Sequence, residues 1–303
     1  TQFSEQLDRM LGEMASQQVP GTPDTIHLAS RCIAAIGNYL DELVRGQPDQ
    51  ALRLFDLYSE LARARGQEIP TPGELFFPNL SLRPVFPGPL RINDDPKLLR
   101  ALRGRFERGL LKWFRNGKDP AGPLEMCEAV AGIESQQGVP ASRAFWFAAT
   151  AFFDALGQQA IPADAATKRL CGRIDAQMRR FMEGSAIVAE RLMRDVLYHV
   201  ATADAHSPII DAIRDAYALQ ELIPTANHGI SDTPLAPILR KLREELSDAR
   251  EAWAQFSKGG AIGLPRFQDT IALVIDQALT LGQPEVAQLA GALGETARWL
   301  RQD

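Results

Sequence analysis

The side chains best suited to chemistry in this sequence are its four histidines, His27, His199, His206 and His228. An imidazole can serve as a general base, a nucleophile or a metal ligand. The motifs that organise such groups are missing, because the sequence contains no G-x-S-x-G, no G-x-x-x-x-G-K-S/T and no H-E-x-x-H. We therefore predict no catalytic residue, no metal site and no cofactor.

His199 has the most informative sequence neighbours of the four. It lies in the segment VAERLMRDVLYHVATA, whose apolar spacing is that of a helix, and Asp195 precedes it by about one helical turn. A carboxylate at this spacing can pair with the imidazole and favour its charged form. His199 also shares a helix face with Val188, Leu192 and Val196, so a histidine at the boundary of a core is the alternative.

Two further groups have the residue types of ligand sites but not the pattern. Asp204, His206 and Asp211 offer metal-binding atoms, yet their short spacing around Pro208 is weak support for a metal site. The glycines at 259, 260 and 263 follow no predicted strand, so they do not form a dinucleotide-binding loop. We expect them to form a flexible turn between two helices.

Prolines mark where helices must position these groups. Proline lacks the N–H that the first helical turn leaves unpaired, and nine of the 20 prolines open an apolar-periodic segment. No segment alternates as a strand does. We predict an all-α fold of serial antiparallel bundles, with helices at 2–17, 23–45, 48–65, 95–116, 119–136, 140–157, 162–183, 185–203, 208–222, 233–257, 265–281 and 284–301.

The helix predicted at 233–257 has the most regular packing pattern. Apolar residues recur at spacings of three and four, which keeps one seam against a neighbouring helix; they are Leu235, Leu239, Leu242, Leu246, Ala249, Trp253 and Phe256. The two helices that follow have the same repeat. We predict an antiparallel bundle within the chain, with an intermolecular coiled coil as the alternative.

Residues 66–94 break the helical pattern. Prolines at 70, 72, 78, 84, 87 and 89 prevent regular structure, but the apolar residues between them are too many for a solvated linker. We predict an ordered, extended strap that inserts aromatic anchors between helical units, and a groove that docks a peptide is the alternative.

The helix predicted at 95–116 separates its charges from its apolar residues. One side carries leucines, Phe106 and Trp113, and the other side is basic. A basic amphipathic helix suits an acidic partner or a membrane surface, whereas a solvated face with local carboxylate pairs is the alternative. The candidate docking face consists of Lys97, Arg100, Arg105, Arg108, Lys112 and Arg115.

Composition excludes several classes of protein. The formal net charge of −5 argues against nucleic acid as a partner. No apolar run reaches the roughly 18 residues of a membrane span. Three widely spaced cysteines suit reduced thiols in the cytoplasm. The chain begins at Thr1 without a methionine, and we expect it to be a piece of a longer protein.

Two segments carry a family resemblance, ELFFPNLSLRP at 74–84 and VAERLMRDVLYHVA at 188–201. Together with YLDELVRGQPDQALRLFDLYSELARARGQ before them, they resemble the N-terminal region of the CheA-like hybrid histidine kinases of type IV pilus chemosensory systems, the ChpA/PilL family, and the related scaffold protein FimL. The resemblance extends over nearly the whole chain. It implies serial four-helix bundles of the histidine-phosphotransfer (Hpt) type.

Functional Hpt bundles use an H-x-x-K-G motif, whose lysine offsets the phosphoryl charge and whose glycine leaves room for the partner domain. After His199 the corresponding positions are Thr202 and Ala203, and after His27 they are a serine and an arginine. The other two histidines precede proline or glycine turns. The resemblance therefore implies degenerate Hpt-like bundles without a phosphoacceptor.

These observations predict four parts: an N-terminal helical group at 1–65, the strap at 66–94, a pseudo-Hpt bundle at 95–205 and a C-terminal bundle at 206–303. The resemblance implies a non-enzymatic docking segment of a bacterial, cytoplasmic phosphorelay that controls type IV pili. Receiver domains and chemosensory or pilus-regulation scaffolds are the implied partners, and a hybrid-sensor parent would be a histidine kinase. Phosphotransfer through His199 and an unrelated ligand-binding domain, with a cavity lined by His199 or Trp146, stay open.

Overall fold

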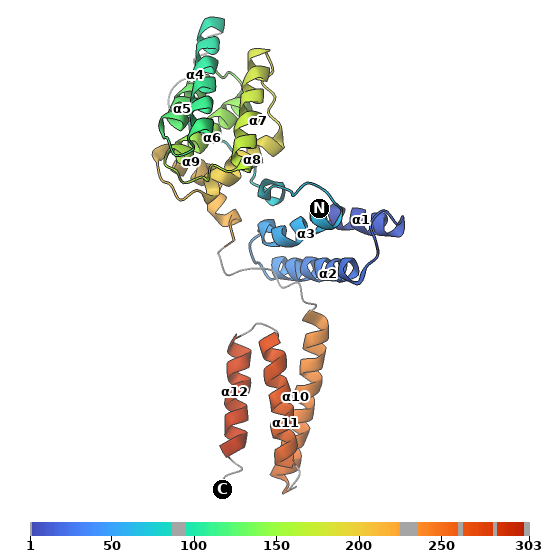
Figure 1. Ribbon diagram of the computed structural model, residues 1–303. Coiled ribbons are helices and arrows are strands. Elements are labelled where there is room, and N and C mark those ends of the chain that lie inside the picture. The colour runs from blue at the N-terminus through green and yellow to red at the C-terminus, as the bar shows by residue number, and fades with distance from the viewer. Residues whose placement is uncertain (1, 87–94, 225–234, 260–262, 281–283, 300–303) are drawn as a thin grey trace. The chain divides into compact units, whose positions relative to one another are not determined.

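The computed structural model describes residues 2–86, 95–224, 235–259, 263–280 and 284–299 (Figure 1). These residues form helices and no strands, which confirms the predicted all-α fold class. The α-helices are α1 (Gln2–Ala15), α2 (Pro23–Val44), α3 (Phe55–Ala64), α4 (Pro96–Arg115), α5 (Ala121–Glu134), α6 (Pro140–Gly157), α7 (Ala165–Met182), α8 (Glu190–Thr202), α9 (Pro208–Ala216), α10 (Leu235–Ser257), α11 (Gly263–Thr280) and α12 (Pro284–Trp299); the short 3-10 helices are η1 (Ala51–Leu54), η2 (Pro72–Leu75) and η3 (Leu219–Leu222).

Capping side chains fix the starts of the helices near the candidate sites. The Asp95 carboxylate accepts a hydrogen bond from the Lys97 N–H at 2.9 Å, one residue before the proline that opens α4. The Ser207 hydroxyl accepts from the Ile210 N–H at 3.3 Å at the start of α9. Such caps satisfy N–H groups that the first turn leaves without a carbonyl partner.

Two predicted helices are shorter than their apolar pattern suggested. The helix predicted at 185–203 begins only at Glu190, because the Gln177 side chain donates to the Ile187 carbonyl at 2.8 Å and holds that stretch extended against α7. The helix predicted at 208–222 is interrupted at Ala218, whose φ of 47° is left-handed. The apolar periodicity continues through both stretches, but a tertiary contact delays the start of one helix and a left-handed residue interrupts the other.

The described structure divides into two compact units, residues 1–28 with 43–230, and residues 29–42 with 231–303. The domain boundaries predicted after residues 65, 94 and 205 stay predictions. The sequence grouped α9 with the C-terminal helices, whereas Ile210 and Ile213 of α9 belong to the core that α5, α6 and α8 form.

The core of the first unit is built around α6. From Ser142 to Leu156 every residue of this helix except Asp154 is buried, because α5, α8 and α9 all pack against it. A helix that is apolar on all sides has no stable place except inside a core. Beside it, α4 and α5 cross at Gly109 and Gly122, where a β-carbon on Gly109 would lie 2.6 Å from the Gly122 carbonyl oxygen.

The strap packs two aromatic side chains against the core, Phe76 and Phe86, and the Phe86 ring meets that of Phe147 edge-on. Phe76 is 1% exposed, and its ring meets that of Tyr198 edge-on with centroids 5.8 Å apart. Phe77 is 42% exposed, so only one of the adjacent phenylalanines enters the core. Residues 87–94 of the strap lie outside the described residues.

A buried side chain from α9 closes the C-terminal end of α8. The Arg214 guanidinium donates from Nε to the Val200 carbonyl at 3.0 Å and from Nη1 to the Ala205 carbonyl at 2.8 Å. Its Nη2 donates to the Ala203 carbonyl. The last turn of a helix leaves carbonyls without partners, and Arg214 satisfies these in the core.

In the second unit, α11 packs against both α10 and α12 (Figure 1). Leu242 of α10 lies in a cluster with Val274 and Ala290, but the other half of the predicted seam is at the surface. Leu239, Leu246 and Trp253 are each 40–44% exposed, because α11 covers only one side of the repeat. Gly260 of the predicted turn and the side chain of Leu235 lie outside the described residues.

Among the helices that the structure describes, none combines the length and the apolar character that a bilayer crossing requires.

Candidate functional site: the His199 cleft and the basic helix

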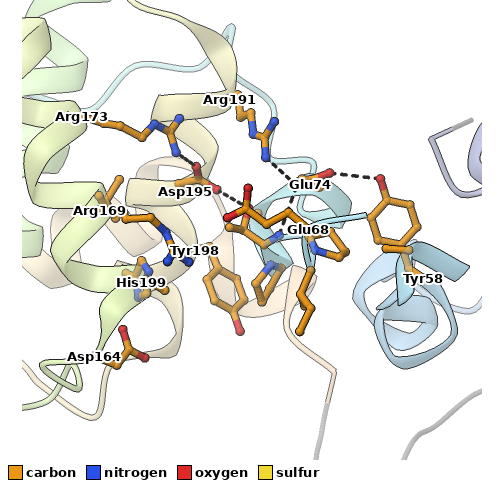
Figure 2. A pocket seen from close by; sticks show the side chains of 18 of the residues that line it. Tyr58, Glu68, Glu74, Asp164, Arg169, Arg173, Arg191, Asp195, Tyr198 and His199 are labelled. Atoms are coloured by element: carbon orange, nitrogen blue, oxygen red, sulfur yellow. Dashed lines mark hydrogen bonds and ion pairs between the residues drawn. The ribbon is translucent and has the colours of Figure 1, made fainter. Parts of the chain in front are cut away.

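A cleft of about 860 Å³ lies between residues 67–74 of the strap, α7 and α8, with Tyr58 of α3 at one end (Figure 2). Its walls carry many charged side chains, among them Glu68, Asp164 and Arg169. His199, the histidine that the sequence singled out, lines this cleft. Trp146 instead lies in the core and is fully buried.

The strap docks on α8 at Asp195. The Thr71 hydroxyl donates to Asp195 Oδ1 at 3.2 Å, and Arg173 of α7 forms an ion pair with the other carboxylate oxygen. Gly73 lies so close that a β-carbon there would overlap Asp195 Oδ1 and stand 3.2 Å from the Asp195 Cα. Glycine is therefore required at this approach, and the buried carboxylate is shared by the strap and α7.

A second carboxylate joins the strap to α3 and α8. Glu74 Oε1 accepts from Arg191 Nη2 at 2.6 Å and from the Thr71 N–H at 3.2 Å. Its Oε2 accepts from the Tyr58 hydroxyl at 3.1 Å. Burial, together with the Glu74 charge, raises the pKa of Tyr58. The cleft wall is thus held by the protein's own charge pairs.

The His199 imidazole faces Phe152 in an edge-on arrangement, with ring centroids 5.7 Å apart. Burial lowers the pKa of His199, and the opposing attraction of Asp195 and Asp164 is the smaller effect. Asp195 does favour the charged imidazole, as expected, but desolvation outweighs both carboxylates and the net shift of the pKa is downward. The Asp195 carboxylate pairs with Arg173 (Figure 2) and accepts a hydrogen bond from the Thr71 hydroxyl.

The position one turn after His199 carries no cation. Thr202 occupies it, and its hydroxyl donates to the Tyr198 carbonyl at 2.9 Å. Arg173 and Arg191, two cations that line the cleft, are paired with Asp195 and Glu74. Arg169 is a third arginine of the cleft and lies beside His199 in Figure 2, so phosphotransfer through His199 stays an alternative prediction.

His27 and His206 are far less enclosed than His199. His27 is exposed on α2. His206 Nδ1 lies 3.1 Å from Asp211 Oδ1, and this imidazole is exposed. Within the described ranges, no three His, Cys, Asp or Glu side chains gather as metal ligands would. His228 lies outside the described residues.

The six basic residues predicted as a docking face all lie on α4, but they divide into two groups. Arg105 forms an ion pair with Glu128 of α5, and Lys112 Nζ lies 2.6 Å from Glu125 Oε1. The other four are exposed to solvent; they are Lys97, Arg100, Arg108 and Arg115. The docking face itself stays a prediction.

Sequence reasoning missed the residues that build the cleft wall. The T-P-G-E run at 71–74 is a capping-box signature that was readable in the sequence. Nothing local to Asp195 or Arg173 signals that they meet, and the same holds for Arg214 and the end of α8. Contacts between residues that are far apart in the sequence cannot be predicted from the spacing of residues along one helix.

Comparison with known proteins gives one finding. Residues 92–229 match the family model described as the second domain of the FimL scaffold protein. No curated protein and no solved structure matches the chain. The predicted relation to FimL is thereby supported, whereas membership of the ChpA/PilL kinases stays a prediction. The segment that contains α4 to α9 is thus similar to the second domain of the FimL scaffold protein.

Proposed function

We propose that this chain is a non-catalytic docking module that holds together protein components of a signalling pathway controlling type IV pili. The observation that carries the proposal is the match of residues 92–229 to a scaffold domain. The helices of this segment form one core with α6 at its centre, which gives a rigid body with outer surfaces for binding.

The surroundings of His199 support a role without phosphoryl transfer. A phosphoacceptor imidazole needs an exposed ring and a nearby cation to offset the phosphoryl charge. His199 packs against Phe152, and Thr202 stands where the lysine of an Hpt motif would be. We propose that residues 95–205 are a degenerate Hpt-like bundle whose partners are receiver domains and pilus-regulation scaffolds.

Direct binding measurements test the proposal. The full chain is immobilised, and purified receiver domains and scaffold proteins of a type IV pilus signalling pathway are passed over it without ATP. We expect saturable binding of at least one of them. Binding of none would contradict the proposal.

A phosphorylation assay separates docking from phosphotransfer. The chain is incubated with the pathway's histidine kinase and labelled ATP, beside a His199→Gln variant. We expect no acid-labile label on either protein. Label on the wild-type chain that disappears with His199→Gln would assign phosphotransfer to this imidazole and refute the non-catalytic role.

A further inference from the structure

We infer that the uncovered side of α4 is a docking surface for an acidic helix of a partner protein. This inference rests on the proposed docking function and assigns it a surface and a partner chemistry. We define the open basic row as the four exposed cations Lys97, Arg100, Arg108 and Arg115.

The row is straight because of its spacing. Residues 97, 100, 104, 108, 111 and 115 recur every three or four positions, which places them on one side of α4. Phe106 and Trp113, which are fully buried, lie on the opposite side of the same helix. At about 1.5 Å per residue the row extends for about 27 Å, enough to meet several turns of another helix.

The chain itself shows what covers cations on α4. Arg105 and Lys112 lie beside the row and are matched by Glu128 and Glu125, which are spaced by about one turn on α5. An acidic helix thus already neutralises one basic edge of α4. Arg108 and Arg115 of the neighbouring row have the same seven-residue separation as Arg105 and Lys112, so this part of the row suits carboxylates arranged in the same way.

Within the part of the chain that the structure describes, no carboxylate forms an ion pair with the row, although the Glu125 charge, already bonded to Lys112, also attracts Arg108. The Arg100 Nε donates to the Pro96 carbonyl at 3.0 Å, and Glu107, the acidic residue of α4, pairs with Arg103 at 2.9 Å. Four like charges on one helix face repel each other, in a protein whose formal net charge is −5. An acidic partner would relieve that repulsion and be drawn to this face at long range.

The apolar residue within the row favours a protein over a polyanion. Leu111 is 57% exposed between Arg108 and Arg115, and Phe114 beside it is 43% exposed. Gly104 has open space around it, with only the Arg108 side chain within 4 Å of a β-carbon position. This face therefore combines the basic row, an exposed apolar side chain and, at Gly104, a position without a side chain. A partner helix fits such a face, because protein interfaces combine apolar centres with charged rims.

The test uses the full chain and a synthetic helical peptide that carries glutamates every three or four residues and one leucine stripe. A peptide with lysines in place of the glutamates is the control probe. Binding is measured by fluorescence anisotropy at low and high salt. The row variant is Lys97→Glu, Arg100→Glu, Arg108→Glu and Arg115→Glu. A matched control reverses four exposed cations elsewhere: Arg63→Glu, Lys168→Glu, Arg180→Glu and Arg240→Glu.

We expect the acidic peptide to bind the wild-type chain about tenfold or more tightly than the row variant, and binding to weaken with salt. The control variant has the same net charge as the row variant and should bind within about twofold of wild type. The row variant should acquire more affinity for the lysine peptide than the control variant of equal net charge, which shows that the row is the contact, and its far-ultraviolet circular dichroism should match that of the wild type, which shows that it is folded. Equal losses in both variants, or no loss in the row variant, would overturn the inference.

Phosphatidylglycerol vesicles and duplex DNA serve as competing ligands. Row-dependent binding to either, without binding of the acidic peptide, would assign this face to a polyanion and overturn the inference. Failure of the row is distinguishable from failure of the proposed function. If pathway proteins bind the wild-type chain and the row variant equally, docking stands and this surface is wrong; if they bind neither, docking itself fails.

Discussion

Replacing Arg214 tests whether the end of α8 depends on a side chain from α9. Arg214→Met keeps most of the buried volume but removes the donors that reach the carbonyls of Val200, Ala203 and Ala205. The guanidinium is almost fully buried, so water cannot replace it without opening the core.

The expected loss can be estimated from these contacts. A hydrogen bond to a charged donor contributes about 1.5–3 kcal/mol, and three bonds that share one side chain are not additive. Leaving the carbonyls unpaired in the core adds a desolvation cost. We expect the free energy of unfolding of the first unit to fall by about 3–5 kcal/mol. Arg214→Lys should give an intermediate loss, because one ammonium cannot reach all of these carbonyls.

Tryptophan fluorescence can report on the first unit alone. Trp113 and Trp146 are fully buried in its core, whereas Trp253 and Trp299 belong to the second unit and are exposed. In a background with Trp253→Phe and Trp299→Phe, urea unfolding followed by fluorescence measures the first unit without a contribution from the second.

A loss below about 1 kcal/mol for Arg214→Met would refute the reasoning, since it would mean that the end of α8 finds other partners. Hydrogen exchange of the α8 amides gives an independent check. If the reasoning holds, exchange near Val200 accelerates more than exchange in the middle of α6.

Three further predictions concern the cleft and the thiols. Gly73→Ala should destabilise the first unit by about 1–3 kcal/mol, because its β-carbon overlaps Asp195; an unchanged urea midpoint would contradict this. Burial lowers the pKa of His199 in the folded protein from its usual 6.5, so as the pH falls the imidazole takes up a proton in the unfolded state before it does so in the folded state. The free energy of unfolding should therefore fall as the pH drops from about 7 to 5. His199→Gln should flatten that slope, and an identical slope would refute the burial effect. Burial raises the pKa of Cys127 to about 11 and raises that of Cys171, so neither should react with thiol reagents at mildly alkaline pH until the chain unfolds.

The positions of the helices were largely predictable because their signals are local. A proline in the first turn and a capping side chain before it act within a few residues, so α9 begins where the sequence placed it, and the proline alone marks the start of α6. Only part of the seam predicted for α10 is buried, because the sequence shows which residues are apolar but not how many helices cover them.

The candidate site was less predictable for a related reason. Spacing identified His199 and Asp195 as neighbours on one helix, and they are. It did not reveal that Thr71 and Arg173 would occupy the carboxylate, because these residues come from the strap and α7. The charge of an imidazole depends on such tertiary neighbours and on burial, which local sequence does not encode.

The enclosure of α6 has a consequence for how this protein can vary. A helix that touches its neighbours around its whole circumference can exchange residues only for others of similar volume, whereas the outer surfaces of α4 and α7 are free to change charge. New binding preferences can therefore arise on the periphery while the interior keeps the same shape.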